Sequence, residues 1–330
     1  MLAVGTDDGI RVFVREGTSW RPGPSGLEGV GITQIAIERG HPAHLLAASR
    51  SGVYESDDGA VSWHDALEGV DARSVVFDAD GTAYVGTYPA GVWRRAPEGA
   101  FEALGALREL PAYGGWTFPV APHLPNVRGI AVSPTRTGAV YAAVEVGGVM
   151  GSVDRGESWA ELREGLQPDV HSVACVEGSR GAAKGGPAEA DRLYAATGVG
   201  FYRSHDAGAS WEAACEGLDE RYSVPLAVHP GEPGIVFTAA ARSRPRTWRT
   251  RPEGADAKIY RSTDGAATWE AVMDGLPDTL TAAVDALVVD GEGTAYAGLA
   301  DGRVLAGPSL AESWSVLAEG LGRVTALAVA

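Results

Sequence analysis

Basic side chains recur at one position of a repeated strand pattern in this chain. Arg73, Arg128 and His171 each stand second in an apolar, strand-like segment, and Arg221 and Arg323 lie just before two further segments of the same kind. Guanidinium groups hold carboxylates and phosphates through two parallel hydrogen bonds. If the segments converge around one axis, these residues predict a site for an anionic small molecule or an acidic peptide.

Loops at the same face add further candidates, since connecting loops on a rigid scaffold carry most binding sites. The predicted ligand-binding set therefore also includes Arg50, Tyr88, Trp116, Glu145 and Trp248. A competing interpretation is that nearby carboxylates neutralise the arginines in structural ion pairs. The carboxylates in question are Asp71, Asp169 and Asp219.

Catalytic chemistry has weaker support in the sequence. A glycoside hydrolase needs two carboxylates about 5 to 10 Å apart at the sugar bond, and the loops offer Glu145 together with Asp7, Asp8 or Asp301. His171 beside arginines suggests instead the base of a lyase. The seven histidines and two cysteines lack metal-ligand spacing. We therefore assign no catalytic residue and expect neither a metal nor another cofactor.

A repeated phrase indicates how these residues are positioned. Its fullest copies place Ser, Asp, Gly and Trp at nearly fixed spacing: SVDRGESW (Ser152 to Trp159), SHDAGASW (Ser204 to Trp211), SDDGAVSW (Ser56 to Trp63) and STDGAATW (Ser262 to Trp269). Shorter copies end at Trp20 and Trp314, and a segment ending at Phe101 makes seven. Serine and aspartate oxygens can accept bonds from backbone N–H groups in a tight hairpin, where glycine permits a positive φ. The tryptophan is expected to bury its ring against the next sheet.

This phrase resembles the Asp-box, or BNR, repeat of sialidases, sortilin-type receptors, xyloglucanases and photosystem II assembly factors. The resemblance implies a β-propeller with the phrase in structural turns on the face opposite the binding site. It covers the repeat architecture of the whole chain, but the Arg-Ile-Pro motif of sialidases is absent. Assembly factors of this kind carry an arginine-rich patch on the propeller. The resemblance implies that Arg73, Arg128 and Arg221 would form the corresponding patch here.

Four short apolar strands surround each copy of the phrase, and such a period is the signature of a repeat architecture. The amino-terminal unit shows three strands, and Val324 to Ala330 can supply its missing inner strand. A propeller must close its ring without exposed sheet edges. The predicted fold is therefore an all-β, seven-bladed β-propeller of four-stranded antiparallel blades, forming a single domain over residues 1–330.

Three insertions interrupt the pattern. Residues 106–126, with several aromatic residues, join the third and fourth units, and a segment with five arginines around Trp248 lies inside the sixth. Both are expected on the candidate binding face as a lid or docking surface, with a flexible, solvated excursion as the alternative. Residues 178–191 should project from the opposite face and be disordered.

The net charge of the chain restricts the kinds of molecule that it can bind. The chain has 43 acidic and 27 basic residues and a net charge of −16, which argues against nucleic acid. No basic and apolar leader precedes the first strand, and no stretch approaches the roughly 20 apolar residues of a membrane span. We expect a cytoplasmic monomer without membrane contact. An acidic surface with two lysines, Lys184 and Lys258, is typical of halophilic proteins, although a GC-rich genome would also replace lysine by arginine.

The sequence thus favours a noncatalytic binding or assembly scaffold. Its arginine and histidine cluster and its two long loops would bind an anionic ligand or an acidic protein segment. A glycoside hydrolase-like enzyme of the BNR-repeat type, acting on a carbohydrate, is the alternative.

Overall fold

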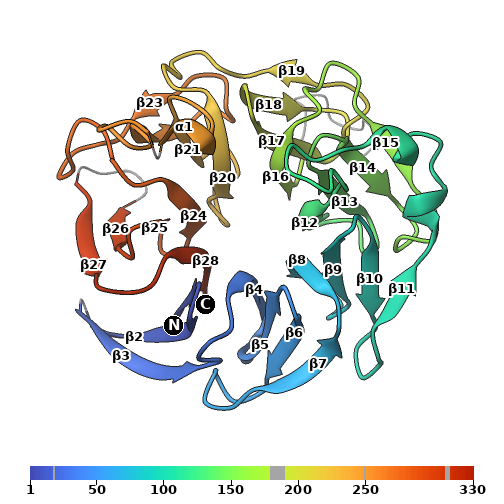
Figure 1. Cartoon of the computed structure of the whole chain (residues 1–330), viewed down its shortest axis with the longest axis horizontal. Helices are drawn as coiled ribbons and strands as arrows, with labels where there is room; N and C mark the ends of the chain where they lie inside the picture. The colour runs from blue at the N-terminus through green and yellow to red at the C-terminus, as the bar shows by residue number, and fades with distance from the viewer. Residues whose placement is uncertain (18, 179–189, 249, 309–312) are drawn as a thin grey trace, which may run out of the picture.

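Seven four-stranded antiparallel sheets are arranged in a ring around a central axis (Figure 1). The computed structural model describes residues 1–17, 19–178, 190–248, 250–308 and 313–330. Most of the insertion predicted to be disordered, residues 179–189, lies outside the described residues. The fold confirms the predicted seven-bladed propeller. We number the blades 1 to 7 along the chain, blade 1 being the sheet that contains both chain ends.

Each blade has one strand at each of four positions, counted outward from the axis. The inner strands, which contact one another in a closed ring, are β28 (Val324–Val329), β4 (Ile32–Glu38), β8 (Asp71–Phe77), β12 (Val127–Val132), β16 (Val170–Val176), β20 (Tyr222–Val228) and β24 (Val284–Val289). The second strands are β1 (Leu2–Thr6), β5 (His41–Ser49), β9 (Ala83–Tyr88), β13 (Val140–Val144), β17 (Arg192–Thr197), β21 (Val236–Ala241) and β25 (Thr294–Leu299).

The outer half of each blade is less buried. The third strands are β2 (Gly9–Glu16), β6 (Gly52–Ser56), β10 (Val92–Arg95), β14 (Gly148–Ser152), β18 (Gly200–Ser204), β22 (Ala257–Ser262) and β26 (Val304–Pro308). The outer strands are β3 (Ser19–Gly26), β7 (His64–Glu68), β11 (Glu102–Leu104), β15 (Ala160–Leu162), β19 (Glu212–Ala213), β23 (Glu270–Ala271) and β27 (Ser315–Ala318).

Among the described residues, helix occurs only in residues 106–126 and in the blade-6 insertion. Residues 106–126 contain the short turns η1 (Ala106–Glu109) and η2 (Tyr113–Gly115), and the blade-6 insertion contains α1 (Pro245–Trp248). None of the helices in the described ranges is both long and apolar enough to cross a membrane.

The second strands form the core between blades. Each of the five residues of β1 and of β13 is buried, so these strands show no alternation of buried and exposed positions. Both faces of such a strand pack against neighbouring sheets, which favours alanine, valine and tyrosine over polar residues. Three tyrosines of this layer, Tyr84, Tyr194 and Tyr296, are fully buried, as is Tyr260 of the third strand β22.

Each complete copy of the repeated phrase closes a hairpin through the predicted side-chain bonds. In blade 5, Ser204 Oγ accepts the N–H of Gly208 at 2.8 Å and donates to Asp206 at 2.7 Å, while Asp206 accepts the N–H of Ser210 at 2.9 Å. The same bonds recur in blades 2, 4 and 6. The hydrogen bonds from Ser62 hold the pKa of Asp58 at about 2. These aspartates therefore have a structural role.

The tryptophan of the phrase joins neighbouring blades, but in the direction opposite to the prediction. Trp211 of blade 5 donates its ring N–H to the carbonyl of Leu162 at 2.9 Å, and its backbone N–H bonds the carbonyl of Glu164 at 2.8 Å. Both carbonyls belong to blade 4, so the ring packs on the preceding sheet and not on the next one. Trp269 and Trp314 make the same pair of bonds to the blades before them.

A glycine in the preceding blade makes this contact possible. Gly165 has φ of +79°, and a Cβ there would lie 2.3 Å from the carbonyl oxygen of Trp211. Gly217 and Gly275 face Trp269 and Trp314 in the same way. We call this pairing of tryptophan and glycine backbones the blade seam.

The carboxyl-terminal strand closes the ring as predicted. β28 pairs antiparallel with β1 from Leu2 opposite Val329 to Thr6 opposite Val324. Val324 is fully buried and packs in the same cluster as Leu2 and Val4. The two ends of the chain therefore lie side by side in blade 1 (Figure 1).

Replacing Gly165 by alanine should destabilise the protein more than the same change at Gly69. Both glycines have positive φ, which costs alanine roughly 1 to 2 kcal/mol, but no atom lies within 4 Å of a Cβ at position 69. The clash with Trp211 should add about 1 to 3 kcal/mol, as overpacking does. Urea unfolding of the two variants measures the difference, and equal losses would show that the blade seam has no energetic weight.

Deleting Val324 to Ala330 should prevent stable folding, because it removes the inner strand of blade 1 and leaves β1 without its partner. Circular dichroism and a thermal melt would report the loss. A truncated chain that melts cooperatively at the temperature of the full chain would contradict this account of ring closure.

Candidate functional site

A β-bulge lies near the start of every inner strand. In six blades the pairing with the second strand skips one residue, and the skipped residues are Thr33, Arg73, Arg128, His171, Asp285 and Thr325. In blade 6 the pairing skips Val224 and Pro225. They include Arg73, Arg128 and His171, which the sequence pattern predicted to converge around one axis. We call the region that these inner-strand positions surround the channel mouth. A bulge turns its side chain away from the regular pleat, so seven blades present seven such side chains around the axis.

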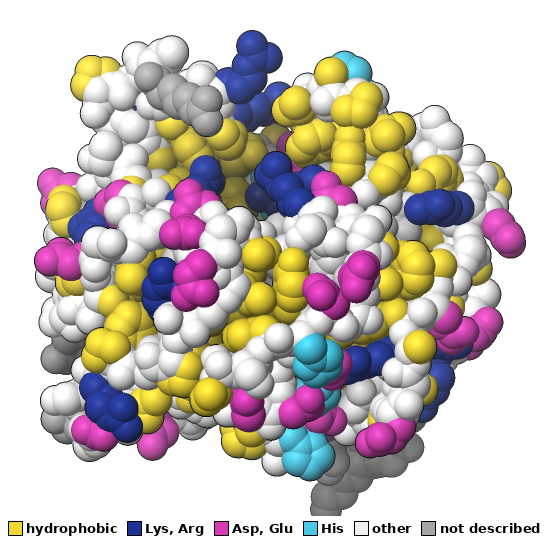
Figure 2. Space-filling view, turned by 60° about the horizontal axis from the view of Figure 1, so that its bottom comes forward, with side chains coloured by type: hydrophobic (Ala, Val, Ile, Leu, Met, Phe, Trp, Pro, Cys, Tyr) yellow, Lys and Arg dark blue, Asp and Glu magenta, His cyan; other side chains and the backbone are white. Residues whose placement is uncertain are grey.

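Several bulged side chains reach the inner strand of the following blade. Thr33 donates to the carbonyl of Ala72 at 2.8 Å, and Thr325 donates to that of Ile32 at 2.6 Å. These bonds fix the relative position of neighbouring inner strands. Figure 2 shows basic side chains, in dark blue, beside a hollow with apolar walls in the upper part of the view.

Arg73 is neutralised by a carboxylate of its own strand. Its Nε and Nη2 atoms lie 2.6 and 2.7 Å from the two oxygens of Asp71. The guanidinium also lies 5.2 Å from the centre of the Tyr88 ring. The competing ion-pair interpretation of the sequence is therefore confirmed for Arg73. Arg323 is paired as well, at 2.7 Å from Asp285.

Arg128 and Glu145 form a second ion pair in blade 4. Arg128 Nη1 lies 3.2 Å from Glu145 Oε1, and the amide of Asn126 donates to Oε2 at 3.3 Å. Glu145 is only 8% exposed. Burial lowers the pKa of Arg128, but the negative charges of Glu145 and of Asp285 across the channel outweigh it and raise the pKa above its usual value.

His171 of blade 5 lies beside this pair. It is 1% exposed, and its Nδ1 lies 2.6 Å from the carbonyl oxygen of Ser223. Its Nε2 lies 3.4 Å from Asp169 Oδ1, and neither of these buried atoms has a hydrogen-bond partner within the described residues. Burial raises the pKa of Asp169, but the cationic Arg128 and Arg244 nearby act to lower it, and the net pKa is below its usual value. Asp169 is therefore a carboxylate.

Glu145 does not have the acidic partner that the sequence suggested. The carboxylate that comes near it is Asp169, with ligand atoms of Glu145, Asp169 and His171 all within 4.8 Å of one another. Asp301 binds Arg303 at 2.7 Å, and Asp8 accepts the N–H of Gly29 at 2.8 Å.

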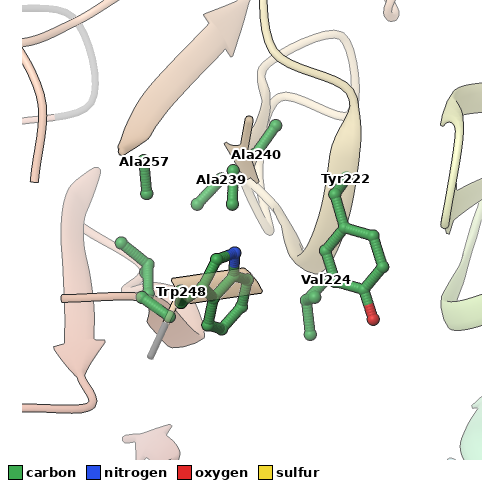
Figure 3. A pocket seen from close by; sticks show the side chains of 9 residues that line it. Tyr222, Val224, Ala239, Ala240, Trp248 and Ala257 are labelled. Atoms are coloured by element: carbon green, nitrogen blue, oxygen red, sulfur yellow. The ribbon is translucent and has the colours of Figure 1, made fainter. Parts of the chain in front are cut away.

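Aromatic rings connect the channel to the blade-6 insertion. The ring of His171 lies 4.9 Å from that of Tyr222, which meets Trp248 edge to face at 6.0 Å. Trp248 donates its ring N–H to the carbonyl of Ser243 at 2.7 Å. Figure 3 shows Trp248 facing Tyr222 and Val224 across a pocket. This pocket has room for about one water molecule, so it is too small for a ligand.

The blade-6 loop, defined as residues 242–248 and 250–256, carries exposed arginines. Arg242 lies 3.2 Å from Asp256. Arg244, Arg246 and Arg251 are exposed and form no ion pair with a carboxylate in the described ranges. Because Trp248 of this loop packs on Tyr222, whose ring lies 4.9 Å from that of His171, the loop comes close to the channel mouth.

Trp116 is placed differently from the other predicted aromatic residues. It is 7% exposed and packs 5.1 Å from the ring of Tyr113 and against Gly147. Tyr113 donates to the carbonyl of Ala90 at 2.8 Å. The insertion at 106–126 thus lies over the loops between second and third strands, on the same face as the blade-6 loop. Trp116 is part of its core.

The remaining predicted residues are solvent-exposed. Arg50 and Arg221 lie at the surface and pair with no described carboxylate. Asp219, which was a candidate partner for an arginine, binds Lys258 and Tyr260 instead.

Sequence reasoning overlooked Tyr222 and Asn126, and it treated Asp169 only as a counter-ion. All three lie two residues before the bulge of their strands, as Asp71 does in blade 3. A comparison of this upstream position among the blades would have found them.

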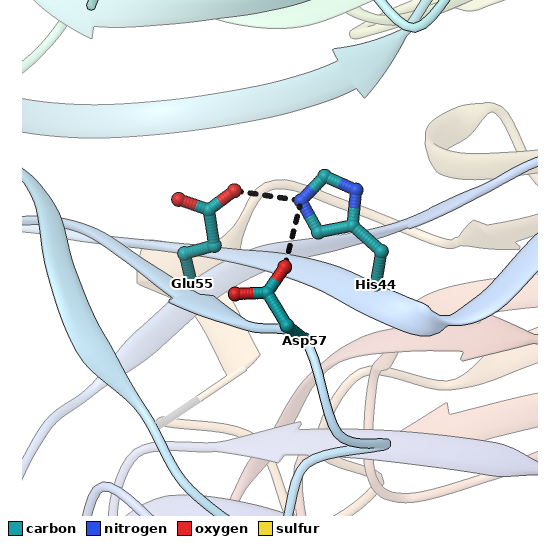
Figure 4. A group of neighbouring side chains, drawn as sticks. All are labelled: His44, Glu55 and Asp57. Atoms are coloured by element: carbon teal, nitrogen blue, oxygen red, sulfur yellow. Dashed lines mark hydrogen bonds and ion pairs between the residues drawn. The ribbon is translucent and has the colours of Figure 1, made fainter. Parts of the chain in front are cut away.

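A second cluster, formed by His44, Glu55 and Asp57, lies in blade 2 (Figure 4). His44 is held between Glu38 and Glu55, at 2.7 and 2.6 Å, so both ring nitrogens bond a carboxylate. Burial lowers the pKa of His44, but these two hydrogen bonds outweigh it and raise the pKa. Both oxygens of Glu55 also bind Arg95 of blade 3. This cluster is a structural ion network between two blades.

Comparisons with known proteins agree with the fold. No protein-family model matches the chain. The xyloglucanase of Hypocrea jecorina (strain QM6a) is 24% identical over 280 residues, covering 82% of this chain and 29% of that protein. The GH74 xyloglucanase structure from Xanthomonas campestris superposes with a TM-score of 0.67 and 19% identity, over 97% of this chain and 52% of that one. The structure of YCF48 bound to D1 peptide has a TM-score of 0.53 and 13% identity, over 93% and 85% of the two chains.

This chain therefore spans about half of the solved xyloglucanase and 29% of the Hypocrea protein. The comparisons show a propeller fold that is shared with GH74 xyloglucanases and with YCF48, together with distant sequence similarity to a xyloglucanase.

Proposed function

We propose that this protein is a noncatalytic binding scaffold whose channel face docks an acidic protein segment or another anionic ligand. The observation that carries the proposal is the set of exposed arginines without described counter-ions on the blade-6 loop, whose Trp248 packs on Tyr222 beside the channel mouth.

The distribution of ion pairs decides which arginines can bind an external anion. Arg73, Arg128 and Arg323 already hold carboxylates, and an incoming anion would have to displace them. Exposed arginines such as Arg244 and Arg246 keep their donor forks available for carboxylate. In a chain of net charge −16, such a local basic surface directs an acidic partner to one face.

Aromatic side chains add an apolar anchor beside the arginines. Tyr222 and Trp248 are half-buried and meet edge to face at 6.0 Å. Tyrosine, tryptophan and arginine are the residues that dominate binding energy at protein interfaces. A peptide would therefore place acidic side chains on the blade-6 loop and an apolar one against Tyr222.

Structural likeness supports a peptide as the ligand. A propeller with this fold, YCF48, has been solved bound to D1 peptide. The superposition covers 93% of the present chain and 85% of that one.

A glycoside hydrolase is the second candidate. The carboxylates of Glu145 and Asp169 approach within 4.8 Å, close to the separation of about 5 to 5.5 Å in retaining enzymes. Similarity to a xyloglucanase also favours it. Against it, Glu145 is buried and held by Arg128 and Asn126, which leaves it poorly placed to donate a proton to a sugar.

Replacing Arg244, Arg246 and Arg251 by glutamine should weaken the binding of a glutamate-rich peptide by at least about tenfold, or roughly 1.4 kcal/mol. Fluorescence anisotropy of the labelled peptide measures the affinity. The difference should shrink at high salt, because exposed charges are screened.

The matched control replaces Arg15, Arg21 and Arg39 by glutamine. These residues are also exposed but lie in blades 1 and 2, so the net charge changes equally while the blade-6 loop stays intact. Equal weakening in both variants, or no binding by the unmodified protein, would refute the proposed docking face.

Under the scaffold proposal the protein should not hydrolyse xyloglucan oligosaccharides, and Glu145→Gln should change nothing in that assay. Released reducing ends can be quantified over a long incubation. Turnover that disappears in Glu145→Gln while the variant keeps its melting temperature would instead establish the hydrolase.

A further inference from the structure

Three potential metal ligands from two blades converge at the channel mouth. His171 offers Nε2, and Asp169 and Glu145 each offer a carboxylate oxygen, all within 4.8 Å of one another. Two of these residues, Glu145 and His171, are buried. The main chain brings them together directly, because Glu145 and Asp169 are paired in an isolated β-bridge between blades 4 and 5.

The histidine has its metal-binding nitrogen free. Nδ1 of His171 lies 2.6 Å from the carbonyl oxygen of Ser223, and a carbonyl can only accept, so Nδ1 carries the proton of this bond. A histidine ligand to a metal almost always donates its other N–H to a carbonyl or carboxylate in this way. Nε2 then presents a lone pair.

That lone pair faces a carboxylate. Nε2 of His171 and Oδ1 of Asp169 are buried, lie 3.4 Å apart and have no hydrogen-bond partner within the described residues. Two acceptors in this arrangement repel each other unless a proton or a cation lies between them. The side chain of His171 has no exposed surface, so bulk water cannot relieve the repulsion at its ring.

The spacing suits a metal ion. Two ligands that bind zinc at about 2.0 to 2.2 Å in a tetrahedron lie roughly 3.3 to 3.6 Å apart. The separation of Nε2 and Oδ1 is 3.4 Å. A hydrogen bond between a charged histidine and a carboxylate would be shorter, at about 2.7 to 2.9 Å.

Neighbouring groups would orient the third ligand. The oxygens of Glu145 accept bonds from Arg128 and Asn126 at 3.2 and 3.3 Å. Each carboxylate oxygen has a second lone pair, so these bonds can persist while Glu145 binds a cation. Two carboxylates and one guanidinium leave the group with a net negative charge, which attracts a cation.

The cluster in blade 2 provides a contrast. Both nitrogens of His44 bond carboxylates, and both oxygens of Glu55 bond Arg95. The donors and acceptors of His44 and Glu55 are thus matched by protein groups, and Asp57 is exposed to solvent. The two clusters contain the same residue types. Only in the cluster at the channel mouth do two buried acceptor atoms, Nε2 of His171 and Oδ1 of Asp169, face each other without a donor among the described residues.

We propose that Glu145, Asp169 and His171 form a binding site for a first-row divalent cation, with Zn²⁺ as the best match. One imidazole and two carboxylates suit zinc, and three protein ligands leave a further position for water or for a ligand oxygen. The site is independent of the proposed docking of an acidic segment, because the cation requires no arginine of the blade-6 loop.

The test titrates ZnCl₂ into the metal-stripped protein at pH 7.5 by isothermal calorimetry. We expect one tight site. Asn126→Ala removes a group that hydrogen-bonds a ligand, so it should weaken zinc binding by roughly 10- to 100-fold. Asp169→Asn removes a ligand itself and should weaken zinc binding by more than that. Co²⁺ in place of Zn²⁺ should give the visible absorption of a four-coordinate site, and Asp169→Asn should remove it.

Two controls keep the result interpretable. Asp169→Asn preserves size at a half-buried position, and its melting temperature without metal verifies the fold. His44→Gln should leave zinc affinity unchanged. Absence of stoichiometric binding, equal affinity in Asp169→Asn, or loss of binding in His44→Gln would overturn the proposal and would indicate that a proton separates His171 from Asp169.

Discussion

From blade 4 to blade 7, the position of each blade relative to the next depends on the close backbone contact at the blade seam. A tryptophan strand lies directly on a glycine of the preceding blade, where no Cβ can fit, and two N–H groups of Trp211 bond carbonyls across the seam. This contact is short and directional, so it fixes both the distance and the angle between sheets. The bulged side chains at the inner ends of the strands converge because the outer ends are held in this way.

Much of the fold could be predicted from the sequence because its determinants are local. The bonds made by Ser204 and Asp206 lie within one hairpin, and the phrase that encodes them recurs often enough to count blades. Because every blade repeats the same order of strands, the sequence also predicts which residue of each inner strand lies at the channel mouth. The prediction that the tryptophan ring packs on the next sheet was wrong. The two neighbours of a blade are equally distant in sequence, so the sequence does not show which of them the ring contacts.

The site was less predictable because it depends on pairing between side chains of different blades. The sequence could place Arg128 and His171 near one axis, but it could not show that Glu145 turns to Arg128, or that Asp169 stays beside His171 without a donor between them. Trp116 illustrates a related limit: an aromatic residue in a long loop can fill the core of that loop. Arginines occur both at the channel mouth and on the blade-6 loop, and the sequence does not distinguish them. Those at the channel mouth are paired with carboxylates and have a structural role, whereas the exposed ones of the loop have no such partner and can bind a ligand.

The central claim is that an anionic ligand binds the face of the ring that carries the channel mouth and the blade-6 loop. It should not bind the opposite face, where the hairpins of the repeated Ser-Asp-Gly-Trp phrase lie. Hydrogen exchange of backbone amides, with and without the glutamate-rich peptide, tests it directly. The account predicts slower exchange in residues 145–147 and 167–171 and in the blade-6 loop, with no change in the turns around Asp58, Asp154, Asp206 and Asp264. Protection confined to those turns, or spread evenly over the ring, would contradict it.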